Sequence, residues 1–126
     1  NQDSHIDEPY KQAKILSENN IIFAFSYAGD MEAMGSRNLP FTAGTAVAYG
    51  LDYEEAIKAL TFNTAKILGI DDRLGSLEKG KEATFFISEG AALNMTTNKI
   101  ESIFIKGSAV STSNHQSKLY EIYKDR

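Results

Sequence analysis

The chain has 126 residues, of which 42% are hydrophobic and 24% are charged, and its formal net charge is −4 at pH 7. This length suffices for a domain with a hydrophobic core, whereas the mild acidity and the lack of a basic cluster argue against nucleic acid or a membrane surface as a partner. The absence of cysteine excludes disulfides and thiolate metal sites, and no apolar run reaches the roughly 20 residues of a membrane-spanning helix.

The first third of the chain predicts a helix, a buried strand and a loop. Asp7 is placed as the N-cap of the helix, Pro9 fits its first turn because no N–H is needed there, and the pair Asn19 and Asn20 suits a left-handed cap at its end. Residues 21–26 (IIFAFS) form an almost continuous apolar and aromatic run, which is typical of a strand covered by helices on both faces. Residues 27–38 are then predicted to form a loop at the carboxyl end of that strand.

The middle third predicts three helices in succession. Asp52 and Glu55 have the capping-box spacing for the second helix, and Asn63 is placed to cap the third. Gly50 and Gly69 are placed to end the first and the third helix. An apolar stripe along the second and third helices is predicted to pack into the core; it consists of Ala56, Ile57, Leu60, Ile67 and Leu68.

The last third changes to β-structure. Residues 84–88 (TFFIS) and 100–107 (IESIFIKG) are short, strand-like and rich in β-forming residues. We expect the segments around Thr84–Ile87 and Ile100–Ile105 to pair as antiparallel strands across a polar loop. Apolar residues at helical spacing within residues 115–126 predict a short terminal helix. This change of pattern divides the chain into an α/β part, residues 1–70, and a β part, residues 71–126.

Residues 71–87 (DDRLGSLEKGKEATFFI) join the two parts through a double bend. Gly75 and Gly80 are placed at its turns, and the charged residues around them are predicted to be solvated. Together with the helix before it, this segment resembles the C-terminal signature of the amidohydrolase superfamily. In that signature T-x-N-x-A-x-x-L-G, here residues 61–69, precedes D-D-R-x-G-S-L-E-x-G-K-x-A, here residues 71–83.

The resemblance extends on both sides of this signature. Residues 37–52 (RNLPFTAGTAVAYGLD) resemble the segment after the last barrel strand in imidazolonepropionase-like members of the superfamily. Downstream, IFIKGSAV is similar to a family strand of the form V-x-V-x-G-x-x-V, with Gly107 and Val110 in place. The resemblance therefore covers roughly residues 21–110.

The resemblance implies an α/β fold in which a (β/α)8 barrel lies beside a small β-sandwich built from both ends of the chain. Such a barrel takes about 200 residues or more, so this chain is expected to be a C-terminal fragment. Residues 1–70 are expected to form the last helix–strand unit and the terminal helices of the barrel. Residues 71–126 are expected to form the C-terminal part of the β-sandwich with a short terminal helix. The start at Asn1, without an initiator Met or a signal peptide, agrees with this expectation.

The resemblance also implies the chemistry. Family members use a divalent metal, expected to be zinc, to activate a water that hydrolyses a C–N bond of a cyclic amide, a peptide or a similar small substrate. An Asp at the end of the last barrel strand binds the metal and moves the water's proton. Asp30 is our candidate for both roles, although YAG separates it from the predicted strand. That Asp30 is a turn residue in a relative without its catalytic acid is an equal alternative, and Glu32 is the fallback acid.

Other residues have weaker assignments. Arg37 is the candidate substrate-binding residue, with a surface ion pair as its alternative. His5 and His115 lie near the two ends without ligand spacing, and the metal-binding histidines of the family lie on earlier strands. We therefore expect this fragment to hold no metal, to be inactive and to associate with itself through its open strand edges. A non-catalytic relative that serves as a binding or scaffolding protein is the alternative function.

Overall fold

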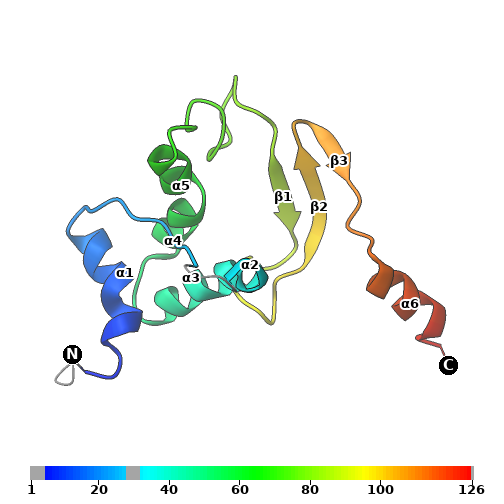
Figure 1. Ribbon diagram of the computed structural model, residues 1–126, viewed down its shortest axis with the longest axis horizontal. Helices are drawn as coiled ribbons and strands as arrows, with labels where there is room; N and C mark the ends of the chain where they lie inside the picture. Colours follow the sequence, from blue (N-terminus) through cyan, green and yellow to red (C-terminus); the bar gives the residue numbers. More distant parts are fainter. Residues whose placement is uncertain (1–4, 28–31, 126) are drawn as a thin grey trace.

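The computed structural model describes residues 5–27 and 32–125. Figure 1 shows the helices α1, α3, α4 and α5 gathered on one side and the strands β1, β2 and β3 on the other, with α6 projecting beyond the strands. The helices of the described ranges are all too short or too polar to cross a membrane. The elements, in chain order, are α1 Glu8–Glu18, α2 Glu32–Gly35, a 3-10 helix η1 Ser36–Asn38, α3 Leu39–Ala48, α4 Tyr53–Leu60, α5 Phe62–Ile67, β1 Phe85–Ser88, β2 Ile100–Ile105, β3 Ser108–Val110 and α6 His115–Tyr123.

The first helix has its predicted ends but a different cap. Asn20 has a φ of 56°, which confirms the left-handed residue predicted after α1. Asp7 stands at the N-cap position, yet its side chain does not bond to the helix N–H groups. Its carboxylate lies instead 3.6 Å from Lys11 Nζ and 3.6 Å from His5 Nδ1. Because Asp7 has helical backbone angles, its carboxylate is used in these ion pairs rather than in a cap.

The caps of α4 and α5 follow the sequence pattern only in part. Asp52 accepts hydrogen bonds from the backbone N–H groups of Glu54 and Glu55, as predicted. The Glu55 side chain does not complete a capping box, since it lies 2.6 Å from Lys58 Nζ. The prediction that Asn63 caps α5 is wrong, because α5 begins at Phe62, two residues earlier than such a cap requires, and has Thr61 at its N-cap.

The predicted strand over residues 21–26 is not formed in the described chain, where residues 21–27 have no regular secondary structure. A strand is defined and stabilised by ladder hydrogen bonds to a neighbour, and no strand of the described residues lies alongside this run. Ile21 and Ile22 are half exposed, whereas Phe23 and Phe25 pack against the core. The apolar side chains of residues 21–26 are therefore partly buried against the core, although the segment does not join a sheet.

The predicted antiparallel pairing in the last third is confirmed. The sheet has the order β1-β2-β3, and the opposed pairs include Phe85 with Phe104, whose rings stack at 4.9 Å. The strand predicted to run through Gly107 ends earlier, because Lys106 and Gly107 have φ values of 50° and 80° and form a two-residue hairpin turn between β2 and β3. The predicted terminal helix is α6.

The core is small and built largely from alanine. One cluster joins α1, α3 and α4 to the loop between β1 and β2, and it consists of Ala13, Ala43, Ala46, Leu51, Ala56 and Leu93. The loop approaches α3 so closely that a Cβ on Gly44 would lie 2.1 Å from the Leu93 carbonyl oxygen. Of the predicted stripe, Ala56 is buried, but Ile67 and Leu68 are 56% and 64% exposed. That part of the prediction is wrong, because α5 turns Ala65 inward and Ile67 lies on the opposite side of the helix.

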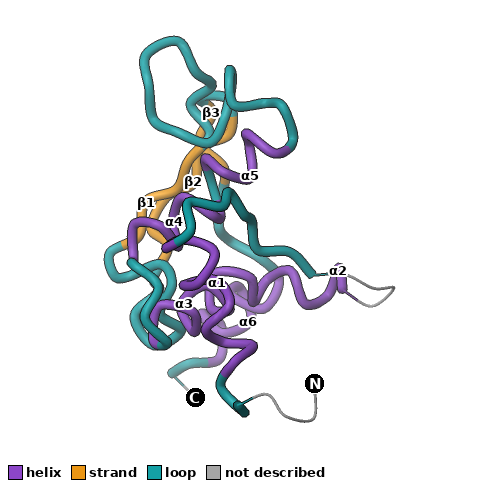
Figure 2. The backbone as a smooth tube through the Cα atoms, turned by 90° about the vertical axis from the view of Figure 1, so that its left-hand side faces the viewer, coloured by secondary structure: helices purple, strands orange, loops and turns teal. Residues whose placement is uncertain are grey.

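The double bend, residues 71–83, packs tightly onto α5. Gly75 has a φ of 91°, and a Cβ there would lie 2.6 Å from Ala65 Cβ. Lys81 is not solvated as predicted: its side chain is only 13% exposed, and its Nζ lies 5.7 Å from the centre of the Phe62 ring. The bend continues into the sheet through a hydrogen bond from Gly107 N to Ala83 O. Figure 2 shows these loops beside α5 and β3, at one end of the molecule.

Candidate functional site

The candidate acid Asp30 lies within residues 28–31, outside the described residues, so its predicted place at the end of the 21–26 run remains a prediction. The segments on both sides of this loop are described. Tyr27 precedes it, and α2, which begins at Glu32, follows it directly. Of the predicted loop, residues 27–38, the part over residues 32–38 is helical, because α2 and η1 occupy it.

A pair of hydroxyl groups holds the end of the described segment 21–27. Tyr27 Oη lies 2.9 Å from Thr42 Oγ1 on α3. Thr42 Oγ1 donates its proton to the Asn38 carbonyl at 3.4 Å, and since a hydroxyl has a single proton, Tyr27 is the donor in the first bond. The end of the 21–27 segment is thus tied to the first turn of α3, next to η1.

A second contact comes from α5. Asn63 Nδ2 donates a hydrogen bond of 3.3 Å to the Phe23 carbonyl, and this contact is partly buried. The rings of Phe23 and Phe25 meet edge to face at 5.7 Å. The 21–27 segment is therefore held by its aromatic rings on the core side and by Asn63 at its backbone. The role of Asn63 had one sign in the sequence, because its amide side chain stands within an otherwise apolar and helical stretch.

Arg37, the candidate substrate-binding residue, lies in η1 and is exposed. η1 directly precedes α3, and Tyr27 is bonded to Thr42 on that helix. The start of α3 therefore links Arg37 to Tyr27. A planar guanidinium at such a position is suited to bind a carboxylate or another oxygen-bearing group. The substrate-binding role of Arg37 stays a prediction.

A metal does not fit the described residues alone. They contain no group of three or more His, Asp or Glu side chains that could hold a metal ion. His5 lies 3.6 Å from Asp7 near the start of α1, whereas His115 opens α6 at the other end of the chain. Two of the usual ligand side chains are thus far apart in the fold, and a closed metal site needs three or four ligands together.

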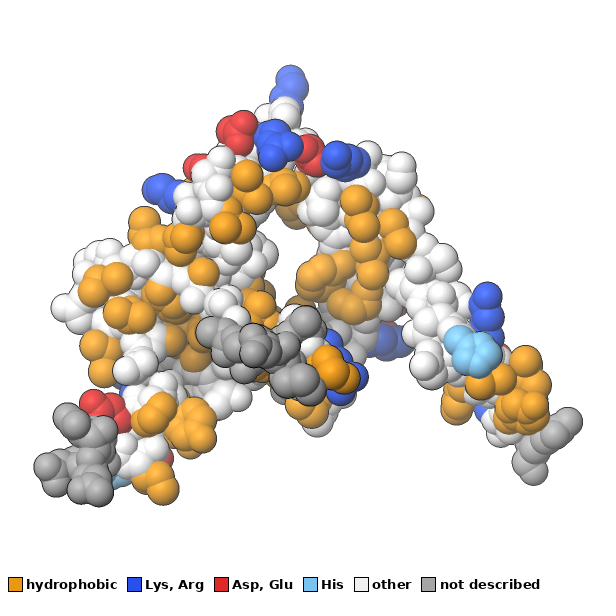
Figure 3. Space-filling model, viewed as in Figure 1, with side chains coloured by type: hydrophobic (Ala, Val, Ile, Leu, Met, Phe, Trp, Pro, Cys, Tyr) orange, Lys and Arg blue, Asp and Glu red, His pale blue; other side chains and the backbone are white. Residues whose placement is uncertain are grey.

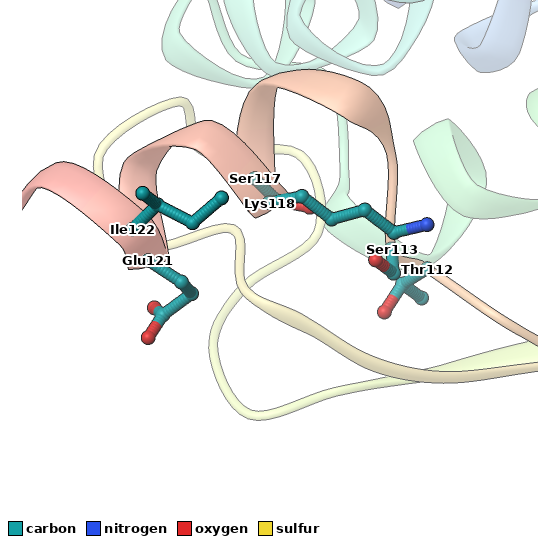
Figure 4. Close-up of a pocket in the computed structure, with 6 residues that line it drawn as sticks. All are labelled: Thr112, Ser113, Ser117, Lys118, Glu121 and Ile122. Atoms are coloured by element: carbon teal, nitrogen blue, oxygen red, sulfur yellow. The ribbon is translucent and has the colours of Figure 1, made fainter.

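A shallow groove is present elsewhere, between α6 and the segment before it. Figure 4 shows Lys118 extending toward Thr112 and Ser113, with Glu121 and Ile122 farther along the helix. All the lining residues are exposed. This groove lies apart from Tyr27, Thr42 and Arg37 in the sequence and the fold, so it is not part of the candidate site.

The shifted pKa values also lie outside the candidate site. The pKa of Glu78 is lowered by the hydrogen bond from Ser76 and then by Lys81. The pKa of Lys58 is raised by its hydrogen bond and charge interaction with Glu55. Both shifts come from local hydrogen bonds and ion pairs, on the double bend and on α4, and do not indicate a catalytic group.

Comparison with known proteins identifies the family. The sequence profile of the amidohydrolase family matches residues 7–110. The imidazolonepropionase of Flavobacterium psychrophilum is 31% identical over 112 residues, which are 83% of this chain and 27% of that protein. An amidohydrolase structure from Thermotoga maritima is 28% identical, with a TM-score of 0.55 over 85% of this chain and 36% of that chain.

A third comparison concerns the fold alone. An adenosine deaminase structure from Xanthomonas campestris with bound zinc is 18% identical, with a TM-score of 0.57 over 86% of this chain and 31% of that chain.

The chain belongs to the amidohydrolase family, a family of hydrolases that fold as (β/α)8 barrels and typically depend on a metal. Within this family it is imidazolonepropionase-like, and it spans about a quarter of the length of the curated relatives it matches.

Proposed function

We propose that this chain is the C-terminal segment of a metal-dependent amidohydrolase that hydrolyses a C–N bond in a cyclic amide, a peptide or a similar small substrate. The observation that carries this proposal is the family match over residues 7–110, because it includes α1 to α5, the double bend and the sheet. The length that the chain shares with its relatives supports the assignment to a segment.

In this proposal residues 1–70 form the last helix–strand unit and terminal helices of the barrel, and residues 71–126 form part of a β-sandwich with α6. Residues 21–26 would become the last barrel strand when a neighbouring strand supplies the ladder hydrogen bonds. A barrel strand is covered on both sides, and the half-exposed Ile21 and Ile22 are apolar side chains that such a cover would bury. Asn63 and the core already hold the opposite side of the segment.

Asp30 and Arg37 carry the site in this proposal. The Asp30 carboxylate is a metal ligand and accepts the proton of the attacking water, which it then gives to the leaving nitrogen. Arg37 binds an oxygen-bearing group of the small-molecule substrate. When bound, a divalent metal, expected to be zinc, acidifies that water. The described residues do not form a metal site by themselves, so in this proposal the other ligands lie outside the described residues, and this chain alone is expected to be inactive.

One observation favours a second candidate function, a non-catalytic binding or scaffolding relative. Tyr27 and the next two residues separate the apolar run from Asp30, whereas the family pattern resembles strand-T-D, with a single Thr before the acid. If Asp30 is only a turn residue, the family fold would serve as a binding unit. The two candidate functions differ in whether the Asp30 carboxylate is needed for turnover.

The test uses the natural polypeptide that contains this chain, purified from its source or expressed in full. Hydrolysis of a panel of cyclic amides and dipeptides is measured together with the bound metal. We expect hydrolysis that a chelator abolishes, and a loss of roughly 10²–10⁴-fold in kcat/KM for Asp30→Asn. Asp72→Asn, at an exposed turn after α5, is the matched control and should leave kcat/KM unchanged. Bound metal without a requirement for Asp30 would contradict the site, and absence of both metal and hydrolysis would favour the scaffolding function.

A further inference from the structure

We propose that Tyr27 and Thr42 are positioning residues for Arg37, a role that rests on the proposed function because Arg37 binds an oxygen-bearing group of the substrate there. The observation behind it is a chain of hydrogen bonds from Tyr27 to Thr42 and from Thr42 to Asn38, the residue that follows Arg37. The two hydroxyl groups act through the guanidinium and are not themselves assigned a contact with the substrate.

The chain of hydrogen bonds has a fixed direction. Tyr27 Oη donates to Thr42 Oγ1 at 2.9 Å, and Thr42 Oγ1 donates to the Asn38 carbonyl at 3.4 Å. Each hydroxyl has a single proton, and both protons are used within the chain. Asn38 is the last residue of η1, so the chain ends one residue from Arg37.

Arg37 lies on a helical path whose middle is a 3-10 turn. α2, η1 and α3 follow one another without a gap, and Gly35, Asn38 and Leu39 at their junctions all have right-handed helical backbone angles. A 3-10 stretch has poorer hydrogen-bond geometry than an α-helix and often marks a hinge. Among the described elements, η1 contacts mainly its chain neighbours α2 and α3. The place of Arg37 therefore depends on what fixes the start of α3.

Tyr27 connects this helical path to the 21–27 segment. The other polar side chain at the end of the segment, Ser26, uses its hydroxyl locally, on the Tyr27 carbonyl at 3.0 Å. Figure 3 shows hydrophobic side chains on both sides of the opening between the helices and the strands, so apolar contacts are abundant on this face. Such contacts are non-directional, whereas a hydrogen bond weakens steeply when its geometry changes. The Tyr27–Thr42 bond is thus the directional link between the segment and α3.

The helix α3 also contains a matched control. Thr45 is exposed like Thr42, and its hydroxyl donates to the Phe41 carbonyl, four residues earlier, at 3.0 Å. Bonds of this kind are common for Thr in helices and by themselves indicate no special role. Within the part of the chain that the structure describes, Thr45 does not bond to a tyrosine. The bond from Tyr27 is what distinguishes Thr42.

The first test uses the natural polypeptide that contains this chain, with the compound of the cyclic amide and dipeptide panel that has the highest kcat/KM. Tyr27→Phe and Thr42→Val should each raise KM about tenfold and leave kcat within about threefold, because a displaced guanidinium weakens binding of the substrate and of the transition state alike. Thr42→Ser keeps the hydroxyl and should restore KM to within about threefold. Thr45→Val should leave KM unchanged, and so should Tyr53→Phe, since Tyr53 on α4 is 39% exposed and Tyr27 is 36% exposed.

A double-variant cycle separates positioning from a loss of stability. In an Arg37→Ala background, Thr42→Val should change KM by less than about twofold, because the guanidinium that it positions is gone. A loss of stability would act in both backgrounds alike. Hydrogen exchange in the peptide covering residues 32–42 should become about tenfold faster in Tyr27→Phe and Thr42→Val and should not change in Thr45→Val.

The outcomes distinguish this proposal from the proposed function. Hydrolysis that needs Asp30, with an unchanged KM in Tyr27→Phe and Thr42→Val, would overturn the positioning role alone. Unchanged hydrogen exchange would overturn it too, as would an equal loss with and without Arg37.

If the polypeptide does not hydrolyse the panel, the proposed function fails, and dissociation constants of the same compounds from isothermal titration take the place of KM. Binding that weakens about tenfold in Tyr27→Phe, but not in Thr45→Val, would then support the positioning role. Binding that is absent, or that does not depend on Arg37 and the two hydroxyl groups, would overturn it.

Discussion

The side-chain amide of Asn63, in the first turn of α5, donates a hydrogen bond of 3.3 Å to the Phe23 carbonyl, forty residues earlier in the chain. This bond connects the helical core to the segment that leads to the candidate site. It also explains why Asn63 does not cap α5, because its side chain is turned toward residue 23 and away from its own helix end.

Asn63→Ala should therefore destabilise the chain. The variant leaves the partly buried Phe23 carbonyl without this donor, and we expect the free energy of unfolding to fall by about 1–2 kcal/mol. Gln12→Ala, on the exposed side of α1, is the control and should change the free energy by less than about 0.5 kcal/mol. Urea unfolding followed by circular dichroism measures both. Equal effects of the two substitutions would contradict the role of the Asn63 bond.

The two glycines of the double bend should differ in their response to alanine. Both have left-handed φ values, 91° at Gly75 and 99° at Gly80. Gly80→Ala meets no atom within 4 Å, so only the backbone cost of about 1–2 kcal/mol applies. Gly75→Ala also collides with Ala65, and this collision should add about 1–3 kcal/mol. Thermal and urea unfolding compare the variants, and a smaller loss at Gly75 than at Gly80 would refute the close packing of the bend on α5.

The N-terminal aspartates of α4 and α1 should also differ. Asp52→Ala removes a side chain that accepts two backbone hydrogen bonds, and it should cost about 1 kcal/mol. Asp7→Ala removes only ion pairs at 3.6 Å, which contribute between about 0 and 1 kcal/mol at a surface. The same unfolding experiments at 0.15 M and 1 M salt separate the two cases. The Asp52→Ala loss should persist at high salt, whereas the Asp7→Ala loss should disappear.

The double bend should lose stability in acid. Ser76 Oγ donates to Glu78 Oε1 at 2.6 Å, and Lys81 Nζ lies 3.2 Å from the same oxygen. The pKa of Glu78 is thereby lowered below its ordinary value of 4.5, the hydrogen bond from Ser76 being the larger cause. The ionised carboxylate is favoured in the folded chain, so its stabilising effect is complete above the ordinary pKa and is lost as the pH falls through the lowered one.

The comparison of Glu78→Gln with the unchanged protein measures this effect. The difference between their urea midpoints should be largest at neutral pH and should shrink as the pH falls below 4.5. Glu101→Gln, at an exposed carboxylate on β2, is the control for the general titration of acidic residues. A difference that grows toward low pH would have the wrong sign and would contradict the assignment.

The sequence alone determined the features that depend on neighbouring residues. The Asp52 cap depends on two N–H groups within three residues, and the positive φ values at Gly75 and Gly80 depend on turn geometry within the bend. The pairing of β1 with β2 follows from two short apolar segments joined by one loop. Local hydrogen bonds and backbone sterics are encoded within a few positions, so a short stretch of residues is enough to predict them. The family motif in residues 61–83 is of the same kind, and it identified the family.

The tertiary structure alone decided the features that need partners distant in the sequence. Residues 21–26 look like a strand, but a strand requires a neighbour that the described chain does not provide. Lys81 looks like a surface lysine, yet the bend lays it over Phe62 and buries most of its side chain. Tyr27 and Thr42 hold the end of the 21–27 segment on α3 through a bond across fifteen residues. Burial and long-range hydrogen bonds depend on how the elements pack, and no short pattern of residues specifies that packing.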